Sequence, residues 1–159
     1  MFGQYKQGVN GYAKVAAETG VMAASPVKLI VMLYEGAITA CHGAVSCMQR
    51  HDIQNKGLLL SKAILIIESG LRLSLDKKAG GQIAENLDSL YAYMSSQLSQ
   101  ANIHNRPEKV HEVLKLLNEL RAAWEAIDQN KATAHVVSQA KINQQGAGVN
   151  NKLAYLAKV

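Results

Sequence analysis

The sequence is poor in cysteine and proline, and each shortage narrows the range of folds. The two cysteines, Cys41 and Cys47, lie six residues apart in one expected helix and would face different directions, so we expect them to be reduced and unpaired. The two prolines, Pro26 and Pro107, both stand where a helix would begin. A chain of 159 residues with so few interruptions is long enough for one domain with a real core.

Long apolar runs are also missing. The longest run, residues 29–34, is far shorter than the roughly 18 residues needed to span a bilayer. Near the N-terminus, no charged region followed by a long apolar segment marks a secretory signal. Apolar residues make up 48% of the chain and charged residues 18%, which favours a globular protein over a disordered one. We therefore expect a cytoplasmic protein that does not insert into a membrane.

Acidic residues are absent from the C-terminal part of the chain. The net charge is +5, and four of these charges come from the four lysines that follow Asp128, where no Asp or Glu occurs. The preceding residues are therefore close to neutral. This distribution is weak evidence for a nucleic-acid-binding surface on the folded body, and we expect none.

Hydrophobic periodicity predicts four long helices, near residues 26–49, 54–75, 81–103 and 107–128. The short connections between them predict antiparallel neighbours. We expect an all-α protein with three parts: an N-terminal arm over residues 1–24, an antiparallel four-helix bundle over 25–128, and a basic flexible tail over 129–159. The tail has the composition for, at most, a short helix.

The second predicted helix has more apolar surface than one face requires. Its stripe is Leu60, Ile64, Ile67, Leu71 and Leu75, but four further apolar residues fall outside it, namely Leu58, Leu59, Leu65 and Ile66. A helix that is apolar on two sides is either central in a bundle or offers a second apolar face to a partner. The residues alone leave both alternatives open.

The chain lacks the motifs of catalysis and of cofactor or metal binding. No CxxC, HExxH, paired Glu-x-x-His or phosphate-cradling glycine loop occurs, and the five histidines do not share a helical face. Gly80 and Gly81 precede a helix and are far more typical of a helix-start turn than of an anion site. We therefore expect no enzyme, no cofactor and no metal.

Six segments, in order along the chain, resemble the flagellar secretion chaperone family FliS. They are GYAKV at 11–15, AASPVKLIVMLYEGAI at 23–38, KGLLLSKAILIIESGLRLSLD at 56–76, GGQIAENLDSLYAYM at 80–94, QANIHN at 100–105 and LRAAWEAI at 120–127. Together they cover roughly residues 5–128, and six collinear segments are specific evidence. The tail lies outside the resemblance. Leu58 and Leu59 depart from the family pattern, in which polar residues are common at these positions.

The resemblance implies a cytoplasmic export chaperone without catalytic activity. Such a chaperone binds the disordered C-terminal segment of flagellin, prevents its premature polymerisation and aids its delivery to the flagellar export gate. Some members also bind the flagellar anti-sigma factor. The residues expected to contact the client in apolar grooves are Ile64, Ile67, Leu71, Leu75, Tyr91 and Met94. Val9 and Tyr12 match the family's arm, which folds over the groove and is moved by the client.

Two other functions fit the sequence less well. The first is a helical adaptor or regulatory protein that binds another flagellar client. The second is a small basic bundle that binds nucleic acid. Salt dependence distinguishes the second alternative, because phosphate contacts weaken steeply with salt whereas contacts in an apolar groove do not.

The arm gives a test by hydrogen exchange. Residues 1–24 have too few apolar positions to form a stable helix alone, so the arm is expected to dock weakly, with Tyr12 over part of the groove. Adding a flagellin C-terminal peptide should therefore change amide protection in residues 5–15. Identical exchange with and without the peptide would show that the arm is an ordinary terminus that takes no part in client binding.

Overall fold

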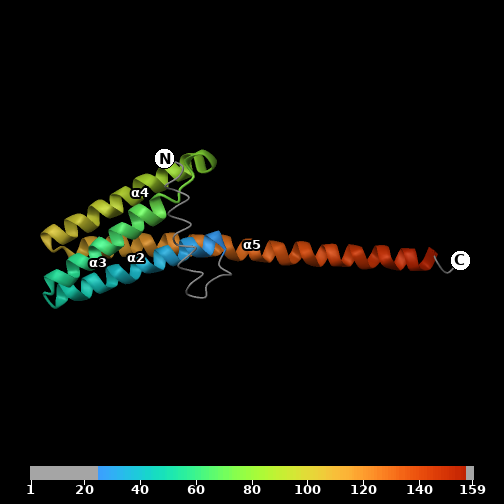
Figure 1. Cartoon of the computed structure of the whole chain (residues 1–159), viewed down its shortest axis with the longest axis horizontal. Helices are drawn as coiled ribbons and strands as arrows, with labels where there is room; N and C mark the ends of the chain where they lie inside the picture. The colour runs from blue at the N-terminus through green and yellow to red at the C-terminus, as the bar shows by residue number, and fades with distance from the viewer. Residues whose placement is uncertain (1–24, 157–159) are drawn as a thin grey trace.

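The protein is a bundle of four helical rods. The computed structural model describes the backbone of residues 25–156 and the side chains of residues 25–140. Its elements are α2 (Pro26–Gln49), α3 (Ile53–Leu65), the π-helical segment η1 (Ile66–Arg72), α4 (Lys77–His104) and α5 (Pro107–Leu156). α3 and η1 form one continuous rod (Figure 1), and the described residues contain no strand. The prediction of an all-α helical bundle is confirmed.

The four rods occupy the corners of a square. α2 packs along α3 on one side and α5 on the other, while α4 packs along α5 and along the α3–η1 rod. α2 and α4 therefore face each other diagonally across the core. The turns at 50–52 and 105–106 lie together at one end of the bundle, which we call the turn end (Figure 1). The beginning of α2 and the connection at 73–76 lie at the other end, which we call the Ser25 end.

Local sequence signals set the helix starts. The Ser25 hydroxyl accepts a hydrogen bond from the Lys28 backbone N–H at 3.1 Å, and Pro26 follows in the first helical position, as predicted. The same hydroxyl donates to Asp128 of α5 at 3.0 Å, which ties the start of α2 to α5. Asp52 and Asp76 cap α3 and α4 in the same way. Each cap satisfies backbone donors that would otherwise lack a partner.

The second rod differs from a regular helix. Residues 66–72 form a π-helix, and π turns are rare and add one residue to a helical turn. Gly70 and Leu71 are both buried within it. The Ser74 hydroxyl donates to the Gly70 carbonyl at 2.5 Å and helps to end the rod. Hydrophobic periodicity gives no sign of this change, because it assumes a constant helical period.

α4 begins earlier than the predicted start at residue 81. A first turn over residues 77–80 is followed by a kink at Gly81, where φ is +52° and ψ is −130°. This conformation is almost restricted to glycine. The predicted helix corresponds to the part of α4 beyond the kink.

α5 is much longer than predicted. The sequence predicts a helix end near residue 128 and a flexible tail, but the structure continues α5 to Leu156 (Figure 1). No proline interrupts residues 129–156, and a helix that is already nucleated extends easily through Ala, Gln and Lys. Every described side chain from Lys131 to Ala140 is exposed, so residues 131–140 of this extension pack against no part of the described bundle.

α2 is the most apolar helix and makes the most extensive contacts with the other rods. By length and composition alone it could cross a membrane, but a buried core helix meets the same criteria. Its small residues allow close approach of the neighbouring rod. The Leu59 side chain of α3 packs against Gly43, where a Cβ would lie 2.9 Å from Leu59 Cδ1. Ile66 lies over Gly36 in the same manner, at 3.3 Å.

This close approach predicts that two glycine substitutions will change the free energy of unfolding by different amounts. Gly57→Ala should raise the free energy of unfolding by about 0.5–1 kcal/mol, because alanine is the better helix former and its Cβ finds ordinary contacts. Gly43→Ala should lose that gain, because Leu59 must move. Urea denaturation measures both. Equal stabilisation by the two substitutions would show that α2 and α3 are not tightly packed at Gly43.

Candidate functional site

The structure buries four of the six residues predicted to contact a client. Ile67 and Met94 are 0% exposed, Tyr91 is 1% exposed and Leu71 is 2% exposed, and all four belong to the central hydrophobic core. In this arrangement they offer no accessible apolar surface. Ile64 and Leu75 are half-buried and pack against the same core. Only these two of the six combine a core contact with surface available to a partner. Val9 and Tyr12 lie outside the described residues.

Apolar burial is uneven along the bundle. Towards the turn end, core residues such as Ala44, Leu98, Ala101 and Val110 are completely buried. Towards the Ser25 end, large apolar side chains of α2, α4, α5 and the connection at 73–76 are only partly buried against the core: Ile30, Leu33, Leu75, Leu87, Leu90, Leu120 and Trp124. Three more are exposed there: Leu73, Ile83 and Ile127. We call these ten residues the Ser25-end surface.

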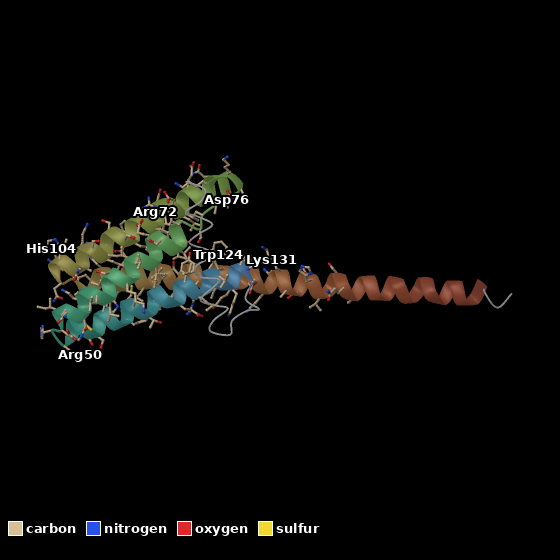
Figure 2. All side chains as sticks on the ribbon, viewed as in Figure 1. Arg50, Arg72, Asp76, His104, Trp124 and Lys131 are labelled. Carbon is tan, nitrogen blue, oxygen red and sulfur yellow. The ribbon has the colours of Figure 1, made fainter. Side chains whose placement is uncertain are left out.

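A pair of buried tyrosines underlies this surface. The hydroxyls of Tyr34 on α2 and Tyr91 on α4 form a short hydrogen bond across the core, and their ring centroids are 6.4 Å apart. Burial raises the pKa of both phenols, while hydrogen bonding with Tyr91 and Trp124 lowers that of Tyr34 to a smaller extent. Both tyrosines therefore remain neutral. Trp124 packs against the same core as the pair, and it lies where α5 passes the first turns of α2 (Figure 2).

Charged side chains border this surface on the α4 side. Arg72 at the end of η1 pairs with Glu68 at 2.9 Å and with Asp88 of α4 at 2.7 Å, and Lys77 reaches Asp88 at 3.4 Å. The hydrogen bond from Arg72 is the main cause that lowers the pKa of the Asp88 carboxyl. These pairs are partly exposed, so each contributes little to stability. Their effect is to fix the end of η1 against α4.

The site offers apolar contacts and a few hydrogen bonds. Among the described residues, no group of three His, Cys, Asp or Glu side chains is placed to hold a metal ion. The arrangement suits an apolar or amphipathic chain lying across the ends of the helices.

Comparison with known proteins decides the family. The family model described as "Flagellar protein FliS" matches residues 8–131. The chain belongs to the FliS family. It is 45% identical over 120 residues to the flagellar secretion chaperone FliS of Salmonella typhimurium, a match that covers 76% of this chain and 89% of that protein.

Two further FliS relatives match over a similar range. The flagellar secretion chaperone FliS of Escherichia coli K12 is 42% identical over 118 residues, covering 74% of this chain and 87% of the relative. The protein of the same name from Vibrio cholerae is 40% identical over 119 residues, covering 75% and 87%. The FliS model match takes in the arm and the Ser25-end surface and stops near the start of the α5 extension.

Sequence reasoning missed most of the Ser25-end surface of this FliS protein. Leu87, Leu90, Leu120 and Trp124 lie on stripes that periodicity assigns to the core. Periodicity shows which face of a helix points inward, but not how completely the neighbouring rods cover that face. Leu120 and Trp124 lie near the predicted end of the fourth helix, which is the one available signal, because the ends of a bundle are covered less than its middle.

The tyrosine pair predicts a non-additive mutant cycle. Tyr34→Phe should lower the free energy of unfolding by about 1–3 kcal/mol, because it leaves the buried hydroxyl of Tyr91 without its hydrogen-bond partner. The double variant with Tyr91→Phe should lose less than the sum of the two single losses. Tyr93→Phe, at an exposed tyrosine bonded to Glu112, is the control and should change little. Additive losses in urea denaturation would contradict the pairing.

Proposed function

We propose that this FliS-family protein is a cytoplasmic export chaperone that binds the disordered C-terminal segment of flagellin. Binding would prevent premature polymerisation and aid delivery of flagellin to the export apparatus. The single observation that carries the proposal is the Ser25-end surface, where α2, α4, α5 and the connection at 73–76 contribute large apolar side chains that the bundle leaves partly uncovered. The names of the relatives support the secretion role, since each is called a flagellar secretion chaperone.

The physical logic concerns a client that is unfolded before export. A disordered segment that later forms helices carries apolar stripes. Covering those stripes prevents the segment from polymerising prematurely. The half-buried residues at the Ser25 end have the required chemistry. Each is held in position by the core and still exposes part of its side chain, so binding does not require the bundle to be rebuilt.

The predicted contact residues take different parts in this proposal. Ile64 and Leu75 would touch the client directly, together with Leu87, Leu90 and Trp124. Ile67, Leu71, Tyr91 and Met94 would support those residues from beneath, and would meet the client only if the rods separated at this end. The arm residues Val9 and Tyr12 are proposed to cover the surface in the absence of client.

The proposal includes two further partners. The export gate would receive the loaded chaperone, and the flagellar anti-sigma factor is a second client in some family members. A helical adaptor for another flagellar client remains the alternative function. Co-purification with full-length flagellin and with flagellin lacking its C-terminal segment separates the two. Retention of the truncated flagellin would favour a different binding mode.

Paired alanine substitutions test the surface. Leu87→Ala should reduce affinity for a flagellin C-terminal peptide by about tenfold and reduce stability only modestly, because its side chain is partly exposed. Leu98→Ala, in the fully buried core, should lower the free energy of unfolding by about 2–5 kcal/mol and leave the affinity of the folded protein nearly unchanged. Isothermal titration calorimetry and urea denaturation measure the two quantities.

The same measurements on Leu71→Ala and Tyr91→Ala decide whether these buried residues contribute to binding. Leu58→Ala is the matched surface control, because Leu58 is 63% exposed on α3 and is not part of the Ser25-end surface. Loss of affinity in Leu58→Ala but not in Leu87→Ala would place the client on the outer face of α3 and refute the proposed site.

A further inference from the structure

A pocket at the turn end lies outside the proposed client surface. Its volume is about 350 Å³, and it lies where α2 ends, α3 begins and α4 ends. The side chains of Cys47 and Met48 contribute apolar walls, and Lys56, Asn102 and Asn105 contribute polar ones. The 24 residues of α2 separate this pocket from the Ser25 end by about 36 Å, at 1.5 Å per residue.

Two exposed isoleucines border the pocket. Ile53 in the first turn of α3 is 74% exposed, and Ile103 in the last turn of α4 is 75% exposed. They are the most exposed of the large apolar side chains in the described part of the chain. Neither residue contributes to the buried core, so the bundle itself gives no reason for an aliphatic side chain at either position.

A buried lysine lines the same pocket. Lys56 is only 5% exposed, and its Nζ donates to the Asn102 carbonyl at 3.1 Å and to the Asn105 side-chain oxygen at 3.5 Å. These bonds place a positive charge at the C-terminal end of α4, where the helix dipole favours it. An ammonium group has three donors, and the described residues supply acceptors for two of them. One donor is left for an acceptor brought by a ligand.

One lysine and one aspartate, Lys56 and Asp52, line the pocket, and Arg50 lies beside it without lining it. Arg50 donates to the neutral side chains of Ser46 and Cys47, so its charge is not neutralised by those contacts. The backbone N–H and the side-chain amide of Asn55 both donate to the Asp52 carboxylate. Asp52 thereby caps the start of α3. The Asp52 carboxylate is thus engaged by Asn55, whereas the Lys56 ammonium keeps one donor unused by the described residues. A buried ammonium donor without an acceptor is best satisfied by a carboxylate, so the pocket favours a partner that brings one.

We propose that the turn-end pocket is a second protein-docking site, for an acidic segment of another protein that carries an aliphatic side chain next to a carboxylate. The aliphatic side chain packs between Ile53 and Ile103 against Met48, and the carboxylate accepts from Lys56 Nζ. Such a site leaves the Ser25 end free, so one chaperone can hold its client and a second protein together. The proposal does not depend on the identity of the client.

Defined peptides test the chemistry of the partner. The probe is a ten-residue peptide, blocked at both ends, with a central leucine flanked by glutamates. Two matched peptides replace the glutamates by glutamines or the leucine by alanine. In ¹H–¹⁵N spectra of the full-length protein, the first peptide should shift resonances of residues 47–56 and 102–105, and each matched peptide should bind at least about tenfold more weakly.

Substitutions at exposed positions test the site without threatening the fold. Ile53→Ser with Ile103→Ser should weaken binding of the glutamate peptide by about tenfold. Leu58→Ser with Leu65→Ser removes two leucines of similar exposure, 63% and 60%, from α3 outside the pocket and should leave binding within about twofold.

Several results would overturn the proposal. Equal binding of the glutamine peptide would remove the role of the carboxylate, and equal loss in the two double variants would show non-specific apolar adhesion. Shifts confined to the Ser25 end would place the peptide on the client surface. Concentration-dependent dimerisation in sedimentation, with shifts at residues 47–56, would show that the occupant is a second copy of the chain.

Discussion

The hydrogen bond between Tyr34 and Tyr91 is the constraint on which the rest of the bundle depends. It joins the two rods that lie on diagonal corners, whereas every other large contact in the bundle is between neighbouring rods. Apolar packing is tolerant of small sliding movements, but two buried hydroxyls satisfy each other only in one register. The pair thus fixes how α2 and α4 stand relative to each other. The pair lies next to the Ser25-end surface, where the apolar side chains are only partly buried.

Local signals explain the features that the sequence predicted well. Ser25-Pro26 and Pro107 mark helix starts through interactions within a few residues, and the stripes identify the inward faces of the rods. Of the predicted client residues, Ile67, Leu71 and Met94 lie on such stripes and Tyr91 lies beside one, and these inward positions are also why they are buried. Which part of a stripe stays uncovered depends on how the rods diverge, and no local pattern contains that information.

The features that the sequence did not predict are those that break its periodicity. The π-helical segment 66–72 inserts a residue into a helical period, and Gly81 turns the chain within α4. The continuation of α5 beyond residue 128 is the opposite case, because the polar, glycine-containing composition predicts a flexible tail whereas the established helix continues through it. The turn-end pocket likewise forms from residues far apart in the sequence, such as Cys47 and Ile103.

The length of α5 has a consequence for the behaviour of the protein in solution. A helix of 50 residues is about 75 Å long, whereas a compact globule of 159 residues has a radius of gyration of about 15 Å. The molecule is therefore a short bundle with a projecting rod (Figure 1). Such a particle tumbles anisotropically and elutes from a sizing column ahead of its mass. For a 17.2 kDa chain, early elution is thus expected of the monomer and does not by itself indicate a dimer.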